Sequence, residues 1–244
     1  MKPWLVIPCY DHGPALRPVV DALAAYRLPG LVIDDGSGVE TRAALAALAA
    51  RHPWLEVHRH ERNGGKGAAL ATGYRVAAAR GATHALQLDA DGQHEVADVP
   101  RFLDAMQKHP EALVLGAPVF DRSVPRSRLY GRQISRVLVW LFTLSFDVRD
   151  PLCGFRGVPL EPTLRLLARV RLGTRMDFDP ELAVRLVWDG VPVESVATPV
   201  RYPAGGLSHF DVVADDLRLA WLYVRLGAAL PFRAPGLLAR RVGA

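Results

Sequence analysis

The chain has 244 residues, of which 50% are hydrophobic and 23% charged, a composition typical of one globular domain with a sizeable core. Its formal net charge of +5 indicates either an anionic partner or a solvated basic surface, and its two distant cysteines argue against a disulfide framework or a zinc site and favour a reducing compartment. We expect no signal peptide, because Met1-Lys2-Pro3 leads straight into a predicted strand, and no stretch reaches the ~20 apolar residues that span a bilayer.

Strands and helices alternate in the first part of the chain. Short apolar runs predict strands at residues 4–8, 31–33, 55–59, 85–88 and 112–116, and apolar residues at helical spacing predict helices at 16–26, 40–51, 68–80 and 98–108. This alternation favours an α/β fold with a doubly wound, mainly parallel sheet and helices on both faces.

The pattern changes after Gly116. We expect a mobile arginine-rich loop at residues 121–132, because Pro125 argues against a continuous helix there. The remaining predictions are helices at 134–144, 181–188 and 215–230, a loop or short strand at 150–157, an extended edge segment at 191–200 and a flexible loop at 204–209. We therefore expect one α/β domain over residues 1–210, followed by a C-terminal helix that ends near Pro231 and a basic tail, over residues 211–244, packed on it.

Two carboxylates one residue apart, Asp89 and Asp91, end the fourth predicted strand and are followed by Gly92. Open α/β sheets bind ligands at the carboxyl ends of their strands. Carboxylate oxygens suit Mg²⁺ or Mn²⁺, which are commonly shared with the phosphates of a substrate. The plain structural alternative is a solvated Asp-Gly turn.

Acidic residues also follow the first two strands, at Asp11 and at Asp34-Asp35. A metal ion, ribose hydroxyls or a lysine should compensate this row of carboxylates. Asp35 could accept hydrogen bonds from a base or a ribose, although residues 34–37 also fit a turn and helix cap. Residues 63–67, which include Lys66, fit either a phosphate cradle or a plain glycine-rich turn.

Five short motifs occur in order along residues 4–202: VIPCY (6–10), IDDGS (33–37), NGGKGA (63–68), DADGQH (89–94) and DPLCGFR (150–156). In this order they resemble family-2 inverting glycosyltransferases, and in particular the dolichyl- or polyprenyl-phosphate sugar transferases. The resemblance implies a GT-A fold, a UDP- or GDP-linked sugar donor, and Mg²⁺ or Mn²⁺ held by the paired acids.

The resemblance, together with the residues argued above, gives the expected site. The expected donor contacts are Pro8, Tyr10, Asp11, Asp35, Lys66, Asp89, Ala90, Asp91, Arg201 and His209; the metal residues are Asp91, Asp89 and Gln93; and the acceptor residues are Arg132, Ser135 and Arg156. The chain departs from the subgroup in having His209 where a lysine is expected and Pro118 where an arginine is expected. The spacing of Arg132 and Ser135 is also one residue shorter than the subgroup's.

The expected chemistry depends on the acceptor. Departure of a diphosphate builds negative charge, which a metal on Asp91 and a basic side chain from a closing loop would stabilise. A hydroxyl acceptor needs a carboxylate base, for which Asp179 is the first candidate and Asp177 the second, whereas a phosphate acceptor needs no base and would be oriented by Arg132. Both acids also fit the favourable charge of a helix N-terminus.

The C-terminal segment combines apolar residues with Arg233, Arg240 and Arg241. It fits an anionic membrane surface, or a helix packed on the core with a solvated tail, and any membrane attachment should be peripheral. We expect a cytoplasmic protein, with contact to the inner face of the cytoplasmic membrane left open.

The predicted activity is metal-dependent, inverting transfer of a sugar from a nucleotide-diphosphate donor to a lipid-linked or hydrophobic acceptor, either a polyprenyl phosphate or a lipid hydroxyl, with no nucleic-acid partner. A sugar-1-phosphate nucleotidyltransferase is one alternative, although residues 9–13 lack the glycine-rich basic loop that it needs. A non-catalytic protein that binds sugar nucleotides is the other.

Overall fold

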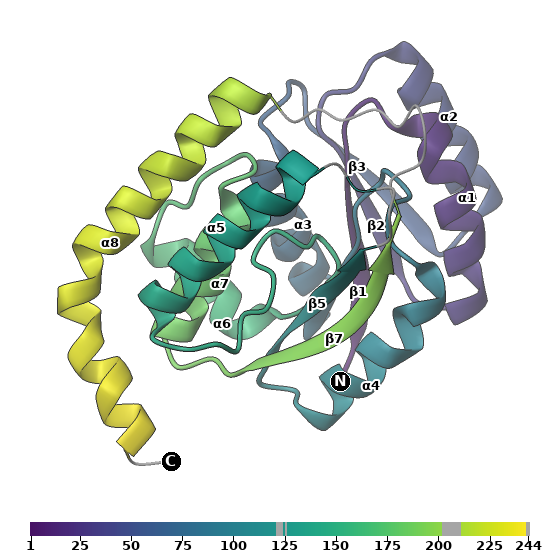
Figure 1. Cartoon of the computed structure of the whole chain (residues 1–244). Helices are drawn as coiled ribbons and strands as arrows, with labels where there is room; N and C mark the ends of the chain where they lie inside the picture. The colour runs from purple at the N-terminus through teal and green to yellow at the C-terminus, as the bar shows by residue number, and fades with distance from the viewer. Residues whose placement is uncertain (121–123, 125, 202–210, 243–244) are drawn as a thin grey trace.

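The computed structural model describes residues 1–120, 124, 126–201 and 211–242, which form a mixed sheet with helices on both faces (Figure 1). The strands of this described part lie in the order β3-β2-β1-β4-β6-β5-β7. They are β1 (Pro3–Cys9), β2 (Gly30–Asp34), β3 (Leu55–Arg59), β4 (His84–Gln87), β5 (Leu113–Phe120), β6 (Arg156–Pro159) and β7 (Val193–Val200). The helices are α1 (Gly13–Leu23), α2 (Val39–Arg51), α3 (Lys66–Ala79), α4 (Val99–Lys108), α5 (Arg126–Thr143), α6 (Leu160–Arg169), α7 (Phe178–Trp188) and α8 (Val212–Val242), with 3₁₀ turns at Ala24–Tyr26 and Val96–Asp98.

Most strand pairs are parallel, which confirms the predicted doubly wound α/β class. β1 pairs in parallel with β2 and β4, β2 with β3, and β5 with β7, whereas β6 runs antiparallel between β4 and β5. The register places Cys9 opposite Asp34 and Val6 opposite Gln87. The loops after β1, β2 and β4 therefore start at one edge of the sheet, where ligands of such folds bind.

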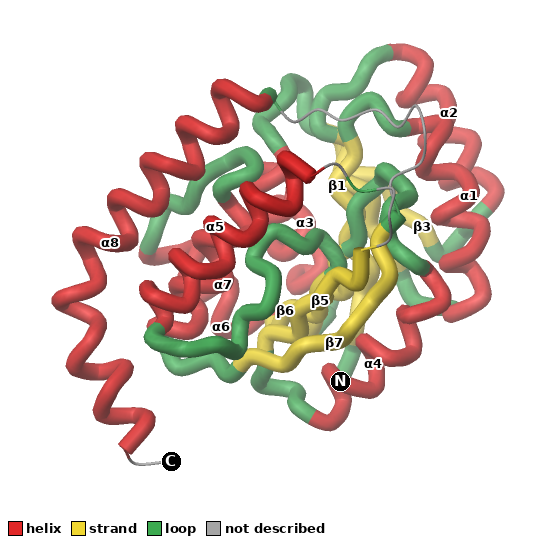
Figure 2. Tube along the Cα trace, viewed as in Figure 1, coloured by secondary structure: helices red, strands yellow, loops and turns green. Residues whose placement is uncertain are grey.

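Helices cover both faces of the sheet (Figure 2), and the buried hydrophobic side chains form clusters on each face. Side chains of a strand alternate between the two faces. Leu5, Ile7 and Cys9 accordingly belong to one buried cluster with α1 and α4, while Val6 belongs to a second cluster with α3 and α7. Cys9 is thus a small buried side chain, as predicted.

The predicted loop at residues 121–132 is wrong from Arg126 onward, where α5 begins. Residues 121–123 and 125 of that prediction lie outside the described residues, as does the predicted loop at 204–209. In the sequence, Pro125 directly precedes the helix rather than interrupting it. A proline is tolerated at the start of a helix, because the first N–H groups have no intrahelical acceptor.

The predicted end of the C-terminal helix near Pro231 is also wrong, since α8 continues to Val242. Tertiary contacts hold this extension on α7. The Arg233 guanidinium lies over the Trp188 ring at 5.5 Å, and Arg240 donates to the backbone carbonyl of Trp188 at 2.9 Å. Of the helices described, none combines the length and the apolar character needed to cross a bilayer.

Candidate functional site

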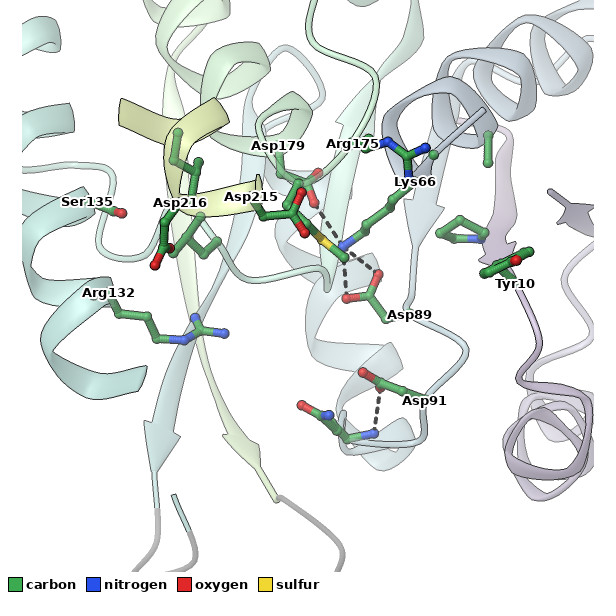
Figure 3. A pocket seen from close by; sticks show the side chains of 18 of the residues that line it. Tyr10, Lys66, Asp89, Asp91, Arg132, Ser135, Arg175, Asp179, Asp215 and Asp216 are labelled. Carbon is green, nitrogen blue, oxygen red and sulfur yellow. Dashed lines mark hydrogen bonds and ion pairs between the residues drawn. The ribbon is translucent and has the colours of Figure 1, made fainter. Parts of the chain in front are cut away.

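A pocket of about 1380 Å³ begins at the carboxyl ends of β1 and β4 and extends to α5 and α8 (Figure 3). It brings together residues that are distant in sequence. The expected site residues in its wall are Pro8, Tyr10, Asp35, Lys66, Asp89, Ala90, Asp91, Gln93, Arg132, Ser135 and Asp179.

Four expected site residues lie away from the pocket wall. The Asp11 carboxylate accepts a hydrogen bond from the Gly38 N–H at 2.8 Å, and Asp177 accepts one from the Arg175 N–H at 3.1 Å. The exposed Arg201 side chain lies 3.8 Å from Glu95. Arg156 is fully buried and is described below. His209 is outside the described residues.

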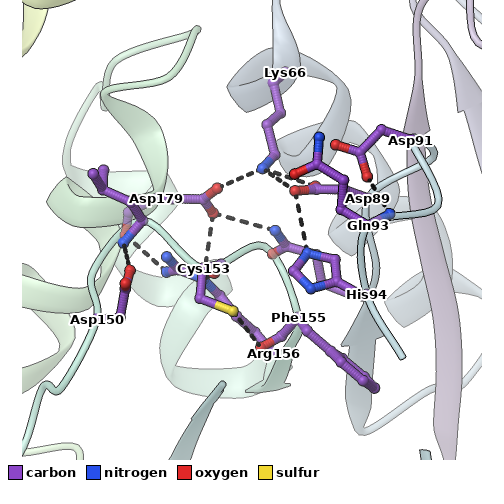
Figure 4. A network of polar contacts seen from close by, with 12 residues as sticks. Lys66, Asp89, Asp91, Gln93, His94, Asp150, Cys153, Phe155, Arg156 and Asp179 are labelled. Carbon is purple, nitrogen blue, oxygen red and sulfur yellow. Dashed lines mark hydrogen bonds and ion pairs between the residues drawn. The ribbon is translucent and has the colours of Figure 1, made fainter. Parts of the chain in front are cut away.

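Lys66 forms two ion pairs at the polar end of the pocket (Figure 4). Its Nζ lies 2.8 Å from Asp89 Oδ1 and 2.9 Å from Asp179 Oδ2. Burial alone would lower the pKa of Lys66, but Asp179 and Asp89 outweigh burial and raise it. Burial would likewise raise the pKa of Asp89, but Lys66 and His94 hold it well below its usual range. Lys66 is therefore the positive group that compensates the acidic strand end.

Two glycines make this close arrangement possible. A Cβ at position 154 would lie 1.9 Å from Asp89 Oδ2, so the carboxylate packs directly on the backbone after Cys153. Gly65 has a φ of +97°, and a Cβ there would lie 2.4 Å from the Thr174 carbonyl oxygen. The glycine-rich loop can therefore pack against residues 173–177 and aim Lys66 inward.

Asp179 is held on several sides at the base of the pocket (Figure 4). In addition to Lys66, the Gln87 amide donates to Asp179 Oδ1 at 3.3 Å, and Arg156 Nε lies 3.7 Å from the same oxygen. Arg156 also donates to the backbone carbonyls of Asp179, Cys153 and Pro151, at 2.9, 2.6 and 2.5 Å. Arg156 thus supports the pocket from beneath.

Asp35 organises the glycine-rich loop. Its carboxylate accepts hydrogen bonds from the N–H groups of Gly64 and Gly65, at 3.0 and 2.7 Å, and contacts His60 Nδ1 at 2.8 Å. Asp34 makes the predicted turn, accepting from the Ser37 N–H at 2.9 Å and pairing with Arg59 at 2.6 Å. The predicted cap is wrong, because the N-cap residue of α2 is Gly38 and no side chain caps that helix. Asp35 therefore shapes the wall that it lines.

Asp91 is the acid of the pair that fits a metal best. Within the described ranges no cation forms an ion pair with it, and its Oδ1 accepts a hydrogen bond from the Gln93 N–H at 3.0 Å. Burial and the neighbouring Asp89 raise the pKa of Asp91. No three His, Cys, Asp or Glu side chains of the described chain form a complete metal cage. The oxygen-rich set of Asp89, Asp91 and Gln93 fits Mg²⁺ or Mn²⁺ that takes its other ligands from phosphates and water.

The raised pKa of Asp91 predicts a pH-dependent effect on stability. Because folding raises this pKa, the ionised carboxylate destabilises the native state above that pKa and has no such cost once it is protonated. Asp91→Asn should therefore raise the melting temperature of the metal-free protein at neutral pH and change it little below the ordinary carboxyl pKa. Thermal unfolding of both proteins across this pH range measures the difference. An equal effect at every pH would contradict it.

The opposite end of the pocket lies between α5 and α8, where apolar side chains line the wall together with the carboxylates of Asp215 and Asp216 (Figure 3). Its wall residues that we did not predict are Leu138, Phe142, Asp215, Asp216, Leu219, Ala220, Tyr223 and Val224. Burial raises the pKa of Tyr223 to about 12, so its hydroxyl stays protonated. The helical spacing of the apolar residues predicted these helices, but nothing in it indicated that they share a pocket.

Arg132 lies on α5, on the side of the pocket that carries Ser135 and Asp216 (Figure 3). Its Nη1 donates to both carboxylate oxygens of Asp150, at 2.8 and 2.7 Å, and its guanidinium lies 5.2 Å from the centre of the Phe120 ring. Asp150 also accepts from the Leu152 N–H at 2.8 Å. This network fixes a permanent positive charge on the pocket wall near Ser135.

Arg175 is a second basic wall residue that we did not predict, since no motif marked it. It comes from the segment between α6 and α7 and lies beside Lys66, on the side of the pocket that carries Tyr10 (Figure 3). Its Cγ would lie 2.6 Å from a Cβ at Gly65, which shows how tightly this segment packs on the glycine-rich loop.

Comparisons with known sequences place the chain among sugar transferases. Residues 4–160 match the family described as Glycosyl transferase family 2. Polyprenol monophosphomannose synthase of Mycolicibacterium smegmatis is 32% identical over 227 residues, covering 90% of this chain and 84% of that protein. Undecaprenyl-phosphate mannosyltransferase of Micrococcus luteus is 28% identical over 176 residues, covering 68% of this chain and 70% of that protein.

Two solved structures share the fold. Glucosyl-3-phosphoglycerate synthase from Mycobacterium tuberculosis, in complex with phosphoglyceric acid, has a TM-score of 0.65 at 19% identity and covers 95% of this chain and 79% of its own. A mannosyltransferase from Pyrobaculum calidifontis, in complex with GDP-mannose and Mn²⁺, has a TM-score of 0.60 at 17% identity and covers 100% of this chain and 75% of its own. These similarities confirm the predicted GT-A fold.

Proposed function

The chain belongs to glycosyl transferase family 2, and on that premise we propose that this glycosyltransferase moves a sugar, with inversion, from a UDP- or GDP-linked donor to a polyprenyl phosphate. Family membership favours glycosyl transfer over nucleotidyl transfer or binding without catalysis. Two relatives have polyprenol or undecaprenyl phosphate in their names, and one neighbour was solved with GDP-mannose.

The pocket with two chemically different ends carries this proposal. Asp89, Asp91 and Lys66 line the end at the sheet, whereas Leu138 and Leu219 line the end between α5 and α8. The first end suits a nucleotide diphosphate with its cation, and the second suits the start of an isoprenoid chain. Arg132, on α5 at the second end, would bind the phosphate of such an acceptor.

The contacts of Asp179 favour a phosphate acceptor over a hydroxyl. A general base needs a carboxylate oxygen open to the acceptor hydroxyl, but Lys66 lies 2.9 Å from Asp179 Oδ2 and the Gln87 amide donates to Oδ1 at 3.3 Å. A phosphate is already anionic and needs no base, so we assign Asp179 to positioning Lys66. Asp177 is outside the pocket wall, at the N-cap position of α7, where its carboxylate accepts from the Arg175 N–H.

In the proposed reaction an acceptor phosphate oxygen attacks the anomeric carbon from the face opposite the leaving group. The bond between that carbon and the donor diphosphate breaks, and the nucleoside diphosphate leaves. Arg132 and Ser135 would orient the acceptor phosphate. Asp91, Asp89 and Gln93 would hold a Mg²⁺ or Mn²⁺ ion, which when bound supplies positive charge beside the departing diphosphate. Arg175, Arg201 and His209 are the further proposed donor contacts.

The proposal is tested by transfer assays with UDP- and GDP-sugars and two acceptors, a short polyprenyl phosphate and the matching polyprenol. We expect product only with the phosphate, in the presence of Mg²⁺ or Mn²⁺. Arg132→Ala should lower this transfer by about a hundredfold, because the guanidinium that binds the acceptor phosphate is lost. Slow hydrolysis of the donor should be unchanged. Arg136→Ala, on the same helix and outside the pocket wall, is the matched control.

The Asp179→Asn variant separates the two acceptor classes. It should retain most transfer to the phosphate, since no proton has to be removed. The opposite result would be transfer to the polyprenol that is lost in Asp179→Asn and retained in Arg132→Ala. That result would identify a hydroxyl acceptor and Asp179 as its catalytic base.

A further inference from the structure

The helices α5 and α8 lie side by side (Figure 1). Large apolar side chains exposed to solvent are concentrated on these two helices. Six of them, each more than half exposed, define what we name the α5–α8 face: Ile134, Val137 and Leu141 on α5, and Leu217, Trp221 and Val224 on α8. Their spacing of three, four or seven residues places each set along one side of its helix. Opposite sides of the same helices are buried, through Val139 and Phe142 on α5 and Leu222 and Leu226 on α8.

The α5–α8 face is continuous with the apolar end of the pocket. Ile134 and Val224 are exposed at the surface and also line the pocket wall. Leu138 and Leu219, one helical turn or so from them, continue the apolar lining inward. A surface that adjoins the pocket in this way would bring whatever covers it to the pocket's apolar entrance.

Charge on the same two helices favours an anionic partner. α5 contains four arginines and no acidic residue, and α8 contains five arginines and two aspartates. By sequence the two helices therefore sum to a net charge of +7, more than the +5 of the whole chain, and two of their arginines pair with acids outside these helices, Arg132 with Asp150 and Arg225 with Glu181. One of the two aspartates, Asp215, is buried and paired with Arg218 at 2.7 Å.

We propose that the α5–α8 face docks on the surface of an anionic phospholipid bilayer. Apolar side chains flanked by arginines are the composition that binds to such an interface. Docking would place the apolar end of the pocket at the bilayer, where a lipid-linked acceptor can enter without crossing water. The assignment of the acceptor rests on the proposed function, but the docking itself does not.

Sedimentation with lipid vesicles tests the docking. The wild-type chain should bind vesicles that contain phosphatidylglycerol, bind pure phosphatidylcholine less, and dissociate as salt is added. Leu217→Glu/Trp221→Glu should weaken binding by about tenfold or more, since two apolar contacts are lost and two repulsive charges are added. Val39→Glu/Val57→Glu adds the same charges at exposed positions on α2 and β3 and should bind like the wild type.

Tryptophan fluorescence supplies an independent readout. Trp221 is 63% exposed, so its emission should shift to the blue when anionic vesicles are added. The shift should be absent in Trp221→Phe, which keeps an apolar side chain and should still sediment with vesicles. A shift that persists in this variant, or equal binding by the wild type and Leu217→Glu/Trp221→Glu, would overturn the proposal.

Two further measurements distinguish docking on a bilayer from damage to the pocket and from dimer formation. Donor hydrolysis in solution should be unchanged in Leu217→Glu/Trp221→Glu, because neither side chain lines the pocket. Loss of vesicle binding with hydrolysis intact therefore supports docking whatever the acceptor is. The proposal would be overturned if the wild-type chain did not bind vesicles but formed a dimer that Leu217→Glu/Trp221→Glu dissociates. In that case a second copy of the chain, and not a bilayer, would cover the α5–α8 face.

Discussion

Replacing Asp91 with alanine is expected to lower kcat/KM for sugar transfer by about a hundred- to a thousandfold. Asp91 is the acid of the pair that no described cation neutralises, and burial together with Asp89 raises its pKa. A divalent ion would relieve this charge and bridge it to the donor diphosphate. Steady-state transfer with saturating Mn²⁺ or Mg²⁺ measures the loss.

Donor binding provides the control for this variant. A nucleoside diphosphate should raise the melting temperature of the wild type only when the metal is present, and the rise should vanish in Asp91→Ala. Asp104→Ala removes an exposed carboxylate of α4 that pairs only with Lys108 among the described side chains, and should behave as the wild type. Undiminished turnover in Asp91→Ala would refute the assignment of the metal to this strand end.

Replacing Lys66 with alanine is expected to lower the free energy of unfolding by about 3–5 kcal/mol, the usual cost of removing one partner from a buried ion pair. Two carboxylates depend on this ammonium group, Asp89 at 2.8 Å and Asp179 at 2.9 Å. Without it Asp89 keeps only the more distant His94, at 3.6 Å, and Asp179 keeps Arg156 at 3.7 Å and the Gln87 amide at 3.3 Å. Urea unfolding at neutral pH, fitted with a common slope, measures the change.

A double-mutant cycle tests whether this loss comes from the ion pairs. Lys66→Ala/Asp179→Asn should be more stable than the sum of the two single changes predicts, because the second substitution removes one of the stranded charges. Lys66→Met keeps the apolar stem and separates packing from charge. Strictly additive changes would show that Lys66 contributes mainly through packing.

The sequence was most informative where strands end. The apolar runs of β1, β2 and β4 are short, and each is followed directly by polar residues. The apolar pattern therefore predicts where each strand ends and which polar residues follow it. Parallel pairing then aligns those ends. The pocket accordingly contains Tyr10, Asp35 and Asp91, although their contacts with a donor stay predictions.

Long-range contacts were not predictable in the same way. The resemblance places Arg156 at the acceptor, but the antiparallel course of β6 carries this side chain under the pocket, where three carbonyls accept its hydrogen bonds. The pairing of Lys66 with Asp179 depends on how α3 and α7 pack, which no local pattern encodes. Pro231 likewise signals a helix end locally, but contacts with α7 outweigh this preference.

The built-in ammonium between Asp89 and Asp179 has a consequence for the order in which ligands arrive. Because that group already neutralises one acid of the pair, a bare divalent ion meets little more than a single uncompensated carboxylate. Such a site should hold the ion weakly until the pyrophosphate of the donor supplies further oxygens. Kinetically, the enzyme should therefore capture a preformed complex of ion and nucleotide sugar, and its rate should follow the concentration of that complex.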